Sequence, residues 1–124
     1  MSGRLHPALV WFGVLAAPLA WVAQLVAGYA VQEAGCAPAG TLPVLDADTE
    51  PIIALISVAA LAVAVAGGAA SLVAWRTALA DGGTDPRGRI AFMACAGLLA
   101  SVIFVAAIAL GGVALVFLDA CHPA

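Results

Sequence analysis

Three long uncharged stretches are the feature that most restricts how this chain of 124 residues can fold. They run from Leu5 to Gln32, from Pro51 to Trp75 and from Ile90 to Leu118, and charged residues bound each of them. Roughly 20 helical residues cross a hydrocarbon core of about 30 Å, so each stretch can span a membrane with some tilt. The pattern predicts an all-α integral membrane protein with three transmembrane helices.

Composition supports this class, because the chain is 65% hydrophobic and 9% charged, outside the range of ordinary soluble domains. No alternation of polar and apolar residues indicates the strands of a membrane barrel. We therefore expect one membrane domain over residues 1–124 and no soluble domain. Its expected parts are helices at about 8–31, 52–76 and 90–118, an outer loop at 32–51, an inner loop at 77–89 and an outer tail at 119–124.

A cleaved signal peptide is the main alternative for the first stretch, because Arg4 precedes an apolar run and a small-residue segment around Cys36 follows it. The run is too long for a typical signal core and contains Pro18 and Gln24. Cys36 also lies too far along the chain for the usual cleavage distance. We therefore expect a transmembrane helix here.

The basic residues predict the orientation of the chain. All four lie before the first stretch or between the second and third, at Arg4, Arg76, Arg87 and Arg89. Cytoplasmic loops carry the excess of basic residues, so the N-terminus is expected inside and the C-terminus outside. The net charge of −3 gives no reason to expect nucleic-acid binding.

The first stretch contains two polar or helix-breaking positions of interest. The amide of Gln24 in hydrocarbon would be costly without a hydrogen-bond partner. Either it makes an interhelical hydrogen bond, or it faces a partner subunit or cofactor together with Trp21, which shares its helix face. Pro18 is expected to kink the helix near its middle.

Small residues at a spacing of four are candidates for helix packing, because they let helix backbones approach closely in lipid. Gly97 and Ser101 form such a pair in the third stretch. The others are Gly13 with Ala17 in the first stretch, and Ala60, Ala64 and Gly68 in the second.

The cysteines suggest a disulfide. Cys36 and Cys121 both fall outside in the expected topology, where oxidising conditions favour a bridge between them. The alternative is a metal site in which Cys36, Cys121 and His122 offer soft ligands suited to copper. Cys95, within the third stretch, is expected to be a buried small hydrophobic residue.

Catalytic signatures are absent from the sequence. It has no Cys-x-x-Cys-His, no His-Glu-x-x-His, no phosphate-binding loop and no serine nucleophile elbow. Apart from Arg76 at the end of the second expected helix, no charged residue lies inside an expected span, which argues against an ion pathway within this chain. We expect no enzyme activity and no bound cofactor for the chain on its own.

Parts of the chain resemble a group of small bacterial membrane proteins that accompany cytochrome c oxidase and oxidase-assembly proteins. The similar segments are Trp11 to Tyr29 followed by Cys36, Gly88 to Phe104, and the terminal Asp-Ala-Cys-His beginning at Asp119. Histidine often stands in that group where this chain has Gln24. Because glutamine is a poor haem ligand, the resemblance does not carry a haem-binding role to this position.

The resemblance implies a non-catalytic accessory or assembly subunit of a haem-copper respiratory oxidase, a respiratory-chain complex of the bacterial inner membrane. Its partners would be the lipid bilayer and other oxidase subunits, with haem and copper held by those subunits. Two alternatives stay open at this point. One is a standalone structural or interaction protein of the same membrane, and the other is an oligomeric transport or copper-handling module.

Overall fold

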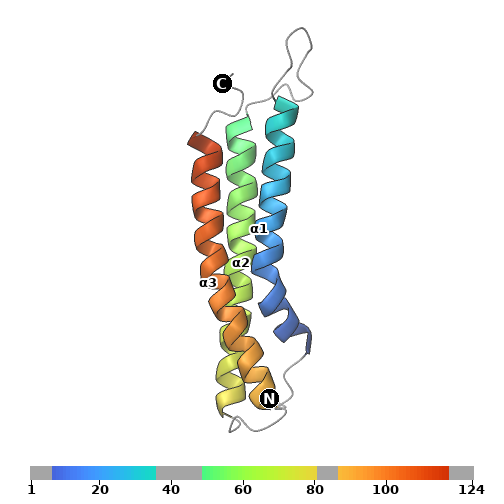
Figure 1. Ribbon diagram of the computed structural model, residues 1–124, viewed down its shortest axis with the longest axis vertical. Coiled ribbons are helices and arrows are strands. Elements are labelled where there is room, and N and C mark those ends of the chain that lie inside the picture. Colours follow the sequence, from blue (N-terminus) through green and yellow to red (C-terminus); the bar gives the residue numbers. More distant parts are fainter. Residues whose placement is uncertain (1–6, 36–48, 81–86, 118–124) are drawn as a thin grey trace.

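The computed structural model describes residues 7–35, 49–80 and 87–117, which form three long helices. They are α1 (Pro7–Gly35), α2 (Thr49–Ala80) and α3 (Arg87–Phe117), and they run up, down and up beside one another (Figure 1). Every pair of helices is in contact. The prediction of an all-helical chain is confirmed, and all three helices are long and apolar enough to cross a membrane.

The helices extend beyond most of the expected spans. Whereas the expected spans ended near the first polar residues, α1 continues to Gly35 and α2 begins at Thr49. Helical hydrogen bonds can continue past the edge of the hydrocarbon core into the headgroup region. The three helices have 29 to 32 residues, so each is about 44–48 Å long. That length matches a bilayer with its headgroup regions. Pro51 lies in the first turn of α2, where its missing N–H has no helical partner to lose.

Pro18 lies inside α1, and the first turns of that helix lie at an angle to the rest of it (Figure 1). Proline lacks an N–H, so the carbonyl of Val14, four residues earlier, loses its normal helical partner. The kink divides α1 into a short segment before Pro18 and a longer segment after it.

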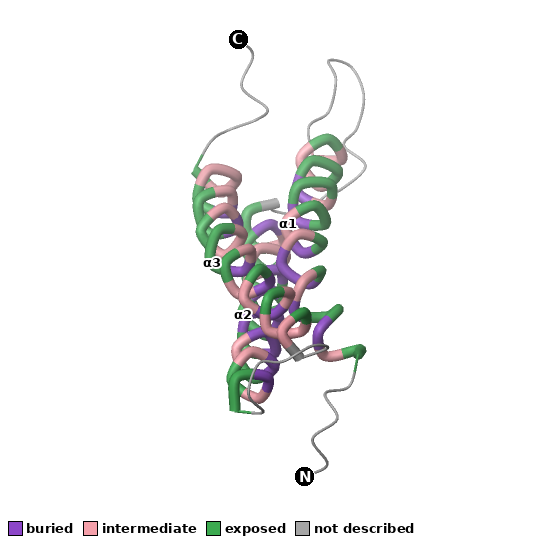
Figure 2. The backbone as a smooth tube through the Cα atoms, turned by 60° about the horizontal axis from the view of Figure 1, so that its bottom comes forward, coloured by how far each residue is buried: buried purple, intermediate pink, exposed green. Residues whose placement is uncertain are grey.

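The interior of the bundle is made mainly of small side chains. Ala17, Ala64, Ala74 and Ala78 are fully buried, and the buried stripes of the three helices face one another (Figure 2). Ile53 and Ile108 are the large apolar side chains that are fully buried, whereas many others point outward, with Phe92 73% exposed. Because most of each apolar helix surface is exposed, this bundle needs a lipid environment.

The two ends of the bundle differ in charge. Exposed Arg76 and Arg89 lie where α2 ends and α3 begins, which we call the arginine end. Exposed Glu33 and Glu50 lie where α1 ends and α2 begins, which we call the glutamate end. The described part of the chain therefore separates its positive and negative charges along the helix axes.

Candidate functional site

Gln24 connects all three helices. Its side chain is 1% exposed, and its Nε2 donates hydrogen bonds to Ser57 Oγ of α2 and to the carbonyl oxygen of Ile108 of α3, each at 3.0 Å. The structure therefore shows the first of the two alternatives for this residue, an interhelical hydrogen bond. We call Gln24, Ser57 and Ile108, with the adjoining Gly112, the glutamine layer.

Glycine in α3 makes room for this amide. A Cβ atom at Gly112 would lie 3.0 Å from Ser57 Oγ and 3.4 Å from Gln24 Nε2, so a larger residue would press on the hydrogen-bonded pair. Gln24 Oε1 is buried and accepts no hydrogen bond. It lies 3.6 Å from where a Cβ of Gly111 would be, which places it against the α3 backbone.

Trp21 packs inside the chain as well. Its ring centroid lies 5.4 Å from that of Phe104 in α3, with the planes tilted by 51°. The ring also covers a buried cluster that includes Ala17 and Ile108. Trp21 and Gln24 thus share a helix face, as the spacing predicted, and both side chains make contacts with α3.

A second contact between the helices lies nearer the arginine end and consists of Gly13, Ser71 and Gly97, one residue from each helix. A Cβ at Gly97 would lie 2.5 Å from Ser71 Oγ and 3.0 Å from the carbonyl oxygen of Gly13. Nothing larger than glycine therefore fits at position 97 without movement. Ser71 Oγ is buried and has no hydrogen-bond partner. We call these three residues the glycine crossing.

Two consecutive glycines of α2, Gly67 and Gly68, pack against different helices. A Cβ at Gly67 would lie 2.7 Å from the Cβ of Ala16 in α1, whereas one at Gly68 would lie 3.2 Å from the Cβ of Ser101 in α3. Ser101 is 3% exposed, and its hydroxyl also has no partner. α2 and α3 therefore pack reciprocally, with a serine of each helix against a glycine of the other.

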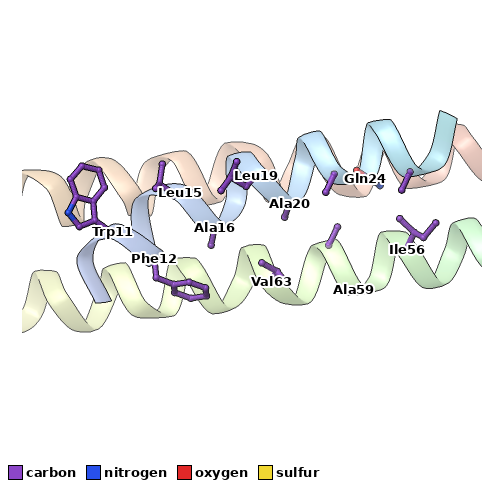
Figure 3. Close-up of a pocket in the computed structure, with 13 residues that line it drawn as sticks. Trp11, Phe12, Leu15, Ala16, Leu19, Ala20, Gln24, Ile56, Ala59 and Val63 are labelled. Atoms are coloured by element: carbon purple, nitrogen blue, oxygen red, sulfur yellow. The ribbon is translucent and has the colours of Figure 1, made fainter. Parts of the chain in front are cut away.

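An apolar groove of about 640 Å³ runs between α1 and α2 on the outside of the bundle (Figure 3). Small residues such as Ala16, Ala20 and Ala59 line it together with larger residues such as Trp11 and Leu19. A smaller depression of about 260 Å³ lies between α2 and α3. Neither offers a set of polar groups that would suit a reaction.

The residues proposed for a disulfide or a metal site, Cys36, Cys121 and His122, lie outside the described residues. Cys95 lies in α3 as a half-buried free thiol. Within residues 7–35, 49–80 and 87–117, no group of three or more His, Cys, Asp and Glu side chains could hold a metal ion. The described part of the chain thus offers contacts between helices as its most specific chemistry.

Ser57, Ser71 and the glycine pair at 111 and 112 contact other helices but were not predicted from the sequence. A signal for them does exist, because a serine or a pair of glycines inside an apolar span is typical of helix interfaces. That signal does not say which helix each residue faces. The spatial pairing of Ser71 with Gly13 and Gly97 is visible only in the folded chain.

The fold and its interior define a small multi-pass helical membrane protein whose conspicuous polar contacts join its own helices. Comparisons with protein-family models, with curated proteins and with solved structures find no match to this chain.

Proposed function

We propose that this protein is a non-catalytic accessory or assembly subunit of a larger membrane complex, and that the complex is a haem-copper respiratory oxidase. The groove between α1 and α2 is the observation that carries the first part of this proposal. It gives the outer surface a concave apolar feature, whereas the amide of Gln24 is used for contacts within the chain. The choice of an oxidase rests on the sequence resemblance.

The proposal includes an orientation and a location. The arginine end faces the cytoplasm of a bacterial inner membrane, because cytoplasmic segments carry the excess of Arg and Lys. The N-terminus is then inside, and the segments beyond the glutamate end are outside. A disulfide between Cys36 and Cys121 joins the outer loop to the C-terminal tail in this arrangement.

The central experiment is purification of the tagged full-length protein from its native membranes in mild detergent. Partners are identified by mass spectrometry, and the visible absorbance of the sample is recorded. Stoichiometric oxidase subunits with haem absorbance are the expected result. A colourless preparation without oxidase subunits would overturn the proposal, and oligomer mass and copper content would then separate a structural protein from a copper-handling module.

Two further measurements test the orientation and the disulfide separately. Reporter fusions after Ala80 and after Ala124 are expected to report the cytoplasm and the outside, respectively. Mass spectrometry without reduction is expected to find a peptide that joins Cys36 to Cys121. Two free thiols in membranes blocked at the moment of lysis would exclude the bridge while leaving the subunit proposal intact.

A further inference from the structure

The two segments of α1 are attached to the rest of the bundle in different ways. After Pro18, Gln24 donates hydrogen bonds to α2 and α3, and Gln32 Nε2 lies 3.4 Å from the carbonyl oxygen of Leu115, which accepts its hydrogen bond. Before Pro18, the contacts are packing contacts of apolar and small residues: Val10 lies in an apolar cluster, Gly13 in the glycine crossing, and Ala16 against Gly67. Ala17 lies in a second buried cluster. In the described part of the chain, no side-chain hydrogen bond ties residues 7–17 to another helix.

The boundary between these segments coincides with a break in helical hydrogen bonding. Pro18 removes the bond to the Val14 carbonyl, and sharp helix kinks occur at such positions. A hinge is a short run of residues whose φ and ψ angles change when two rigid parts of a protein move relative to each other. α1 thus has a locally weakened point between a segment held by hydrogen bonds and a segment held by packing alone.

The groove between α1 and α2 crosses this same point. Trp11, Phe12 and Leu15 line it from the segment before Pro18, whereas Leu19 and Ala23 line it from the segment after Pro18 (Figure 3). A movement of the first segment relative to α2 would therefore change the width of one half of the groove and leave the other half unchanged.

We propose that residues 7–17 form an arm that swings about Pro18 against a fixed body made of the rest of α1, α2 and α3, and that this motion sets the width of the groove. The arm of 11 residues is about 16 Å long, so a swing of about 20° moves its end by about 6 Å. The arm carries Gly13 away from Ser71 and Gly97 as it opens. This inference does not depend on the identity of any partner.

Distances between spin labels in lipid nanodiscs test the proposal. One label pair, at Ala8 and Leu79, reports the arm against α2, and a matched pair, at Val26 and Leu55, reports the fixed body. All four positions are exposed, and the native cysteines are replaced. The arm pair is expected to show a broad or two-peaked distribution extending over about 6 Å, whereas the body pair gives one narrow peak.

Two variants sharpen the result. Pro18→Ala restores the missing helical bond and is expected to narrow the distribution of the arm pair. Gly97→Ala places a methyl group against Ser71 and Gly13 and is expected to shift the arm pair toward its longer distances. The body pair serves as the folding control in both variants. A narrow arm distribution that matches the body pair and does not respond to Pro18→Ala would overturn the proposal.

Discussion

The glutamine layer and the glycine crossing join the same three helices by different means. In the glutamine layer, an amide of α1 donates two hydrogen bonds of 3.0 Å to α2 and α3. In the glycine crossing, the backbones approach closely around Ser71, whose hydroxyl is buried without a partner. The comparison shows that polarity in a membrane interior does not by itself mark a hydrogen bond. Ser71 contributes through its small size and its position.

The two contacts should also respond differently to substitution. Hydrogen bonds between membrane helices contribute modestly, on average about 0.6 kcal/mol, because the separated helices find other partners. Adding atoms to a packed interior causes steric overlap, whose energy cost rises steeply and forces the backbone to move. The glycine crossing, which makes no side-chain hydrogen bond, is therefore expected to be the more sensitive of the two.

Gly97→Ala tests this expectation most directly. The new methyl group would lie 2.5 Å from Ser71 Oγ and 3.0 Å from the Gly13 carbonyl oxygen. We expect a loss of about 1–3 kcal/mol in the free energy of unfolding, measured by SDS titration in mixed micelles. The double variant Gly97→Ala with Ser71→Ala should recover part of this loss. If the single and double variants lose the same free energy of unfolding, the Ser71 hydroxyl is not what the added methyl group overlaps.

Gln24→Leu tests the glutamine layer. The change removes both hydrogen bonds but also removes an Oε1 atom that lacks a partner, so the two effects oppose each other. We expect a loss of roughly 0.5–2 kcal/mol by the same titration, smaller than that of Gly97→Ala. Ser57→Ala in the Gln24→Leu background should add little. A larger loss than that of Gly97→Ala would reverse the ranking of the two contacts.

Gly111→Ala is the matched control for Gly97→Ala, because both add one methyl group to a glycine of α3. At position 111 the nearest atom, Gln24 Oε1, would lie 3.6 Å away, which is an ordinary contact. Alanine also favours a helix more than glycine does. We expect stability to be unchanged or to rise by about 0.4–1 kcal/mol. A loss comparable to that of Gly97→Ala would mean that α3 tolerates no added methyl group at all.

Ser71→Ala has the smallest expected effect. Its hydroxyl makes no hydrogen bond, so the variant loses no partner and leaves little empty space. We expect the free energy of unfolding to stay within roughly 0.5 kcal/mol of that of the parent chain. A loss well above this value would indicate that the hydroxyl does bind a backbone carbonyl in the membrane.

The sequence was sufficient to predict the helical class, because three uncharged stretches of membrane-spanning length leave few alternatives. It also drew attention to Gln24, since a buried amide needs a partner, but it could not identify Ser57 and Ile108 as that partner. Those contacts depend on the rotation of each helix about its axis. In a chain this rich in alanine, many helix faces carry small residues at a spacing of four, so the spacing does not identify the face that packs.

The glycine crossing was only partly predictable for the same reason. The spacing of Gly13, Gly97 and Ser101 indicated small faces on two helices, whereas Ser71 was not predicted as a contact residue. Its role depends on backbones from two other helices meeting at its side chain. Such a meeting of three chain segments leaves no local pattern in any one of them.

The succession of Ser57, Gly67 and Gly68 along α2 has a consequence for the evolution of this sequence. Each residue of a helix turns it by about 100°, so the number of residues between Ser57 and Gly67 fixes the angle between the faces that they present. One residue inserted or deleted in that interval would turn Gly67 and Gly68 away from α1 and α3 while Ser57 kept its place. Descendants of this gene should therefore preserve the length of the interval and its buried alanines, Ala60 and Ala64, and exchange apolar residues freely only at its exposed positions.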